Sequence, residues 1–569
     1  MPDQKFDAWN PGLGSEIPHR LLEHITLYRP ENSDVNYRDA KEAADYCGMK
    51  PRDMAALRVS RLVVHEVLIR VTANLFVPDG PNYAELGLNL RGMADTILRN
   101  GITPQMVLLE AKFATLRRDI ERRLGEIVDR DLYDEAPQPA APTGFLARFT
   151  KKAAPPTPRA DPATAALSAW SAAAPEGADP LELACRRGLK AIVGGIMRQR
   201  GRLMADRDLI VTLATRLVCN TYGSRRIGDW IEPIISASAT AEGYRVLPYQ
   251  AKPMVLNVKG ASASGKSTIR PLQRELAERM GVPWQDFALI SPDYWRKFLL
   301  DYAALDGDFK YAAMLTGEEL EIIDKKLDSY MAAKAARGQV PHLLIDRFRF
   351  DSFTPLAKKT AEGNLLSRFG DQVFMFFMIT PPAETVERAW KRGQKTGRFK
   401  AVDDLLFHNI EAYTGMPQLF LSWVNKTQQR VHFEFLDNDV PLGERPRTVA
   451  FGWNGEVTIL DPEAMRQMNR YQHVNIDARA AADVLLPTEP TDDILADCIR
   501  HVPQVTFADT ETLKVLGRTQ DGDISFEDDG FFDRIGISCD KGPAGKRPKL
   551  DFVHEHRFTL GAWGANPDA

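Results

Sequence analysis

The chain has 569 residues, of which 44% are hydrophobic and 26% are charged, and its formal net charge is −4. This is ordinary for globular protein, the length predicts several domains, and the charge excludes a chain-wide basic field for nucleic acid. Nucleic acid stays a possible partner that the net charge does not indicate. The five cysteines form no C-x-x-C pair, which favours a reducing compartment. Without a leader pattern or a long apolar run, we expect a cytoplasmic protein with no membrane span.

Residues 1–133 have the pattern of a helical domain. Its clearest helix is expected to begin at Thr103, an N-cap residue followed by Pro104. Apolar residues then recur at every third or fourth position, at Phe113, Leu116, Ile120, Leu124 and Ile127. This spacing predicts one buried helix face, and the charged residues between its members predict a solvated one.

A change in composition follows this domain. Residues 134–165 are rich in proline and alanine, which is typical of a semi-rigid or disordered linker. The pattern is helical again over 166–245. We expect the helices on the two sides of the linker to pack together, and the N-terminal helices are candidates for self-association.

From residue 246 onwards, short apolar runs alternate with helical stretches. The runs cover 254–259, 287–292, 342–347, 373–379 and 432–438. Such alternation predicts an α/β domain with a parallel sheet covered by helices on both faces. We place this domain at 246–465, with a hairpin turning at Asn454-Gly455, and treat 466–569 as a mixed C-terminal extension.

The most informative motif is GASASGKST at 260–268, directly after the first apolar run. It fits G-x-x-x-x-G-K-[ST], the loop that cradles nucleotide phosphates with its backbone N–H groups. We predict that Lys266 reaches the β- and γ-phosphates of ATP and that Ser267 holds Mg²⁺. The predicted phosphate-binding set is Gly260, Ala261, Ser262, Ala263, Ser264, Gly265, Lys266, Ser267 and Thr268.

Polar residues follow two other predicted strands. Asp293 comes after the second run, where a carboxylate could take a proton from an acceptor hydroxyl or could simply cap the next helix. Arg296 is a candidate for holding an anionic acceptor. Asp346 ends the third run, where it suits either a water-mediated contact with Mg²⁺ or an ion pair with Arg347 or Arg349.

Basic residues crowd into the segment after the fourth run, at Arg388, Lys391, Arg392, Lys395, Arg398 and Lys400. A mobile lid over ATP needs such cations to neutralise the transferring phosphoryl group. Arg392 and Arg398 are the best candidates for this catalytic role. The alternative is a solvated basic helix end, which is what charge runs usually are.

Together, GASASGKST, SPDYWR, LLIDR, TPPAETVERAWKRG and FEFLDN resemble the zeta-toxin-like P-loop kinases, within the group of small-molecule and polynucleotide kinases. The resemblance covers roughly 250–445. It implies a P-loop NTPase kinase-type fold, a parallel five-stranded sheet flanked by helices. It also implies roles for Asp293 as the base, Lys266 as the phosphate lysine, Arg392 and Arg398 as lid arginines, and Asn438 near the adenine. The loop lacks the family's commoner Gly-Gly-Pro-Gly opening, and the acceptor does not carry over.

We therefore expect an ATP- and Mg²⁺-dependent phosphotransferase acting on a hydroxyl of a small-molecule or nucleotide-like acceptor. The alternative is a nucleotide-binding switch or regulatory ATPase with helical effector domains. An AAA-type motor is disfavoured because Arg347 follows Asp346 in place of a second acid. A GTP switch is disfavoured because Gln428 stands where a guanine reader that began at Asn425 would need an aspartate.

Two patterns near the C-terminus are expected to be structural. DGDISFEDDG at 521–530 partly fits a calcium loop, but Phe526 stands where that loop needs glycine, so we expect an acidic surface loop. His554 and His556 are expected on one face of a strand without a third metal ligand.

Overall fold

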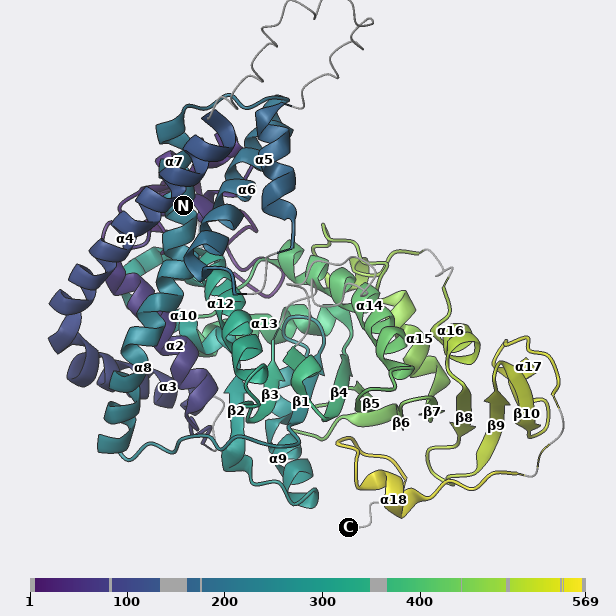
Figure 1. Ribbon diagram of the computed structural model, residues 1–569. Coiled ribbons are helices and arrows are strands. Elements are labelled where there is room, and N and C mark those ends of the chain that lie inside the picture. Colours follow the sequence, from purple (N-terminus) through teal and green to yellow (C-terminus); the bar gives the residue numbers. More distant parts are fainter. Residues whose placement is uncertain are drawn as a thin grey trace, which may run out of the picture. The chain divides into compact units, whose positions relative to one another are not determined.

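The computed structural model describes residues 6–80, 84–133, 161–173, 177–347, 366–441, 443–487, 492–542, 545 and 547–564. The chain forms two compact units, one made of 19–68 and 94–242 and the other of 1–18, 69–93 and 243–569. Every strand in the described part of the chain belongs to the second unit (Figure 1). None of the described helices combines the length and apolar composition that a bilayer crossing requires.

The first unit is helical. Its elements are η1 (His19–His24), α1 (Tyr37–Cys47), η2 (Pro51–Met54), the start of α2 (Val59–Asn74), the end of α3 (Glu85–Thr96), η3 (Ile97–Ile102), η4 (Thr103–Gln105), α4 (Met106–Val128), η5 (Asp129–Tyr133), α5 (Pro162–Ser171), α6 (Pro180–Arg200), α7 (Arg207–Val218), η6 (Cys219–Gly223) and α8 (Ser224–Ala241).

Helix α4 carries the predicted apolar stripe. Phe113, Ile120, Leu124 and Ile127 are buried, while Leu116 is partly exposed. Exposed arginines of α4 pair with glutamates one turn further along, as a solvated face requires. The predicted linker lies outside the described residues as far as 160, and α5 begins at Pro162 behind an Asp161 cap.

The second unit is α/β and contains a ten-stranded sheet in the order β10-β9-β8-β7-β6-β5-β4-β1-β3-β2. The strands are β1 (Met254–Lys259), β2 (Phe287–Ile290), β3 (His342–Asp346), β4 (Gln372–Ile379), β5 (Arg430–Asp437), β6 (Arg447–Trp453), β7 (Glu456–Ile459), β8 (Gln504–Ala508), β9 (Val515–Gln520) and β10 (Asp523–Glu527). Strands β1 to β5 are parallel. The five strands predicted within 246–465 and the β6–β7 hairpin at Asn454-Gly455 are confirmed.

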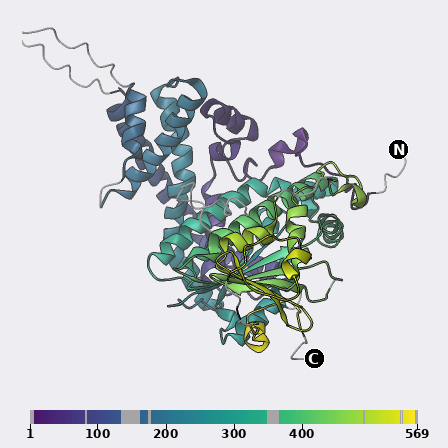
Figure 2. The same cartoon turned by 90° about the vertical axis from the view of Figure 1, so that its right-hand side faces the viewer.

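Helices lie on both sides of this sheet (Figure 2). They are η7 (Lys266–Ile269), α9 (Arg270–Arg279), η8 (Trp284–Asp286), η9 (Pro292–Trp295), α10 (Arg296–Leu299), η10 (Ala303–Tyr311), α11 (Ala312–Leu315), α12 (Gly317–Ala335), η12 (Leu366–Phe369), α13 (Pro382–Thr396), α14 (Val402–Val424), α15 (Pro462–Arg470), η13 (Ala481–Asp483), α16 (Ile494–His501), α17 (Phe531–Arg534) and α18 (Phe552–His556). Every residue of β1 is buried, which explains its unbroken apolar run, since a central parallel strand is covered on both faces.

Two C-terminal expectations are wrong. Residues 523–527 of the expected acidic loop form β10, which pairs with β9, because Ile524 and Phe526 supply the period-two apolar pattern of a strand. The segment with His554 and His556 is helix α18, because the Asp551 side chain accepts the His554 N–H at 3.1 Å and caps a helix there.

A buried glutamate ties the C-terminal segment to the sheet. Glu434 of β5 accepts the backbone N–H groups of Leu560 at 2.7 Å and Gly561 at 2.9 Å, and the hydroxyl of Thr448 at 2.7 Å. Burial raises the pKa of Glu434 to about 7, and the three donors oppose that rise. The C-terminal segment and the parallel strands therefore share one polar anchor.

This anchor predicts a pH dependence of stability. Since the pKa of Glu434 is higher in the folded chain than its ordinary 4.5, its contribution to stability is complete below pH 4.5 and is lost as pH rises towards 7. The unfolding temperature of Glu434→Gln should therefore rise relative to that of wild type as pH increases from 5 to 8. The change corresponds to at most about 3 kcal/mol in the free energy of unfolding. Thermal unfolding with the exposed-site control Glu511→Gln measures this, and a difference independent of pH would contradict it.

Candidate active site

A cavity of about 1400 Å³ lies where the carboxyl ends of the central strands meet. Strand β1 stands between β3 and β4, although β2 follows it in the chain, and open parallel sheets bind ligands at such a switch point. Residues that follow β1, β2, β3 and β5 line the cavity. Small-ligand pockets usually measure roughly 300–1,000 Å³, so this cavity is larger than most of them.

The loop after β1 needs its two glycines. Gly265 has φ 95°, and a Cβ there would lie 2.3 Å from Asn438 Nδ2. At Gly260 a Cβ would lie 2.7 Å from Ser264 Oγ and 2.9 Å from Met378 Cβ. A side chain at either position would push the loop away from its neighbours, which is the physical reason for the spacing of the motif.

Neighbouring strands hold the loop through one carbonyl group. The Ser264 carbonyl accepts the hydroxyl of Thr380, which follows β4, at 3.0 Å and the amide of Asn438, which follows β5, at 2.8 Å. Asn438, assigned by resemblance to the adenine end, therefore contacts the loop backbone directly. Its contact with adenine stays a prediction.

Lys266 folds back over the loop. Its ammonium donates to the Gly260 carbonyl at 2.9 Å and the Ala261 carbonyl at 2.6 Å. Burial lowers the pKa of Lys266 to about 8, and the nearby Asp346 and Asp293 oppose that change. An ammonium in this position gains free energy from an anion placed in the cavity.

Ser267 and Asp346, the predicted metal ligands, are brought together. The Ser267 hydroxyl donates to the Asp346 carboxylate, and Arg270 lies 3.8 Å from the same carboxylate. Arg347 pairs with Asp324, and Arg349 lies outside the described residues. Within the described part of the chain, no three His, Cys, Asp or Glu side chains gather as a metal site. Two protein oxygens suit Mg²⁺, which keeps water and phosphate ligands.

Asp293 begins the far wall of the cavity, on η9. Its carboxylate pairs with Arg296 Nε at 3.1 Å and with Arg398. Burial opposes its ionisation, yet Arg398 and Arg296 hold the pKa of Asp293 well below its ordinary value. Arg296 also donates to the Thr316 hydroxyl at 2.9 Å and to the Ala313 carbonyl. The predicted acceptor-binding arginine is thus fixed beside the predicted base.

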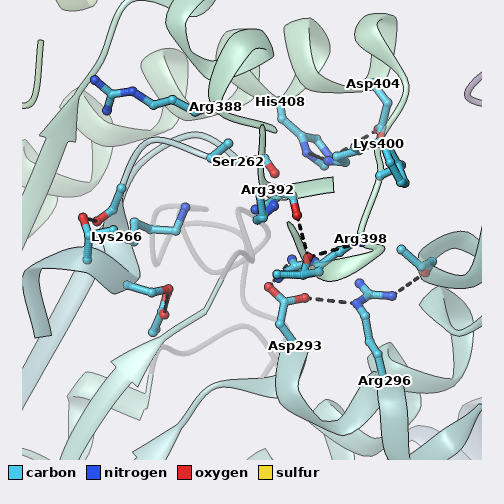
Figure 3. Close-up of a pocket in the computed structure, with 18 of the residues that line it drawn as sticks. Ser262, Lys266, Asp293, Arg296, Arg388, Arg392, Arg398, Lys400, Asp404 and His408 are labelled. Carbon is cyan, nitrogen blue, oxygen red and sulfur yellow. Dashed lines mark hydrogen bonds and ion pairs between the residues drawn. The ribbon is translucent and has the colours of Figure 1, made fainter. Parts of the chain in front are cut away.

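Helix α13 and the loop after it contribute further cations to the wall of the cavity. The helix is capped by Gly397, which has φ 76° and donates to the Gly393 carbonyl at 2.7 Å. Phe399 packs against Trp390, with ring centroids 5.4 Å apart. Arg392 and Arg398 both line the cavity, with Arg392 between Lys266 on one side and Asp293 on the other (Figure 3).

The sequence did not single out Asp404 and His408, although both line the cavity. They lie one turn apart on α14, and Lys400 contacts both, at 3.1 Å from the Asp404 carboxylate. Burial lowers the pKa of Lys400 to about 8 and, together with Lys400, also lowers the pKa of His408. The spacing of Asp404 and His408 on one helix face was the available signal.

A comparison with family models, with curated proteins and with solved structures finds no match to this chain. The geometry of the cavity therefore carries the functional argument.

The packing around Gly265 predicts an energetic coupling. Gly265→Ala should lower the temperature of unfolding, because the new methyl group meets Asn438 and because φ 95° strains an alanine by roughly 1–2 kcal/mol. Adding Asn438→Ala should remove the clash with the new methyl group and leave the energetic cost of the positive φ. A double-mutant cycle by thermal unfolding tests this, and strictly additive effects would show that the two residues do not interact.

Proposed function

We propose that this protein is an ATP- and Mg²⁺-dependent phosphotransferase with a P-loop kinase-type fold, which transfers the γ-phosphate to a hydroxyl of a small-molecule or nucleotide-like acceptor. One observation carries the proposal. Lys266 and Ser267, from the loop after β1, line the same cavity as Asp293, from the end of β2, with Arg392 and Arg398 on its wall. A phosphate cradle, a carboxylate and converging arginines are the parts that phosphoryl transfer requires.

The loop side would bind the donor. Its backbone N–H groups and the Lys266 ammonium would hold the phosphates. Ser267 and Asp346 would hold Mg²⁺, which when bound neutralises charge on the phosphates. Proximity supports this assignment, since the Ser267 hydroxyl already contacts the Asp346 carboxylate.

The opposite side would bind the acceptor. Asp293 would accept the proton of the attacking hydroxyl, and Arg392 and Arg398 would stabilise the charge on the transferring group. Catalysis would then consist of positioning and electrostatics, without a covalent intermediate on the enzyme. The size of the cavity supports two substrates bound together.

The alternative, a nucleotide-dependent switch, has less support. A switch needs no carboxylate placed across the cavity from the loop. A guanine-binding motif at Asn425 and Lys426 has no support either. The Asn425 amide donates to the His501 carbonyl at 2.7 Å, and the Lys426 ammonium lies 3.3 Å from the centre of the Trp423 ring.

Transfer of labelled phosphate separates these functions. Purified protein with γ-labelled ATP, Mg²⁺ and a soluble metabolite extract, or a nucleic-acid pool, should pass the label to an acceptor. We expect Lys266→Ala and Asp293→Asn each to reduce transfer by at least about 100-fold, while the exposed-site control Arg500→Gln keeps it. Release of free phosphate that no acceptor changes would favour the switch, and full transfer by Asp293→Asn would exclude Asp293 as the base.

The lowered pKa of Lys266 predicts how nucleotide binding depends on pH. Phosphates favour the ammonium form, so binding should raise the pKa of Lys266 from about 8 and take up a proton. Affinity for the non-hydrolysable triphosphate AMP-PNP with Mg²⁺ should be constant below about pH 7.5 and fall as pH rises to 9.5. Equilibrium binding measures this. Constant affinity up to pH 9.5 would contradict the lysine's role.

A further inference from the structure

Asp293 pairs with two arginines that come from different elements. Arg296 begins α10 and donates hydrogen bonds to the Thr316 hydroxyl at 2.9 Å and to the Ala313 carbonyl. Arg398 follows the glycine that caps α13 and reaches Asp293 from the segment that we interpret as a lid. Arg296 and Arg398 therefore approach the same carboxylate from two different elements.

Other charged and titratable groups also act on Asp293. They are Lys266 from η7, Arg392 from α13, His408 from α14 and Tyr302, which precedes η10. Burial disfavours the charged carboxylate, but Arg398 and then Arg296 outweigh it, so the pKa of Asp293 lies well below its ordinary value. A carboxylate stabilised in this way is a weak base.

The contact between Arg398 and Asp293 therefore conflicts with catalysis. Arg398 is one of the cations that a transferring phosphoryl group would need, and Asp293 is the carboxylate that would need to accept a proton. A γ-phosphate carries more charge than a carboxylate and accepts bidentate hydrogen bonds from a guanidinium, so it can compete for the same side chain. A diphosphate lacks this group.

We propose that Arg398 is a latch on the base, paired with Asp293 until the γ-phosphate of a bound triphosphate draws its guanidinium away. The latch rests on the proposed kinase function and extends it. Asp293 then becomes able to accept the proton of the acceptor hydroxyl only when a transferable phosphoryl group is present. The ability of Asp293 to act as a base thereby depends on the donor. With a bound diphosphate, Asp293 stays paired with Arg398.

A double-mutant cycle on nucleotide binding tests the latch without any measurement of activity. Calorimetry measures the affinities of AMP-PNP and ADP, each with Mg²⁺, for wild type, Asp293→Asn, Arg398→Gln and the double variant. Asp293→Asn removes the ion pair with Arg398 and should tighten AMP-PNP binding by about tenfold, with ADP binding unchanged. In the Arg398→Gln background the same substitution should no longer tighten binding.

Comparing the gain in affinity with and without Arg398 distinguishes a latch from simple repulsion between Asp293 and the phosphates. A gain of equal size with and without Arg398 is repulsion alone and overturns the latch, as does the absence of any gain. Arg398→Lys, which keeps the charge without the bidentate fork, should retain part of the gain and serves if Arg398→Gln unfolds. Arg500→Gln should behave as wild type. If wild type binds neither nucleotide, the proposed function itself fails, and the latch fails with it.

Discussion

Burial of charged side chains around one cavity constrains the whole site. Lys266, Arg398 and Lys400 lie on its walls, and the lowered pKa of both lysines shows that burial disfavours their charged forms. Excluding water strengthens both the repulsion between these cations and their attraction to carboxylates. Aspartates and glutamates, among them Asp293, Asp346 and Asp404, line the same cavity and equal the lysines and arginines in number. A further anion placed beside Lys266 would favour its ammonium form, which burial disfavours.

The rest of the fold holds these charges in place. Parallel strands buried on both faces give a rigid base, and the loop after β1 is fixed through the Ser264 carbonyl by Thr380 and Asn438. Phe399 directs the chain after α13, so that Arg398 faces inward. The loop after β1 is therefore positioned through its backbone, and the segment after α13 through side-chain packing.

Local patterns were enough to predict much of this structure, and long-range contacts were not. The central strands and the glycines of the loop follow from apolar runs and motif spacing, and Asp293 was placed at the cavity because β2 ends there. The strands β8 to β10 could not be assigned to the same sheet, since the pairing of β7 with β8 joins distant segments. The partners of Arg296 and the contact of Lys400 with His408 also depend on packing. Capping by Asp551 was a local sequence signal for helix α18, and the prediction of a strand at His554 and His556 overlooked it.

Hydrogen exchange of the full-length protein with and without nucleotide tests the central claim most directly. If the cavity binds a triphosphate between the two walls, saturating AMP-PNP with Mg²⁺ should slow exchange both in the loop at 260–269 and in the lid at 392–401. AMP with Mg²⁺ should protect neither segment to the same degree. Protection confined to other parts of the chain, or equal protection by AMP and by the triphosphate, would contradict a triphosphate site here.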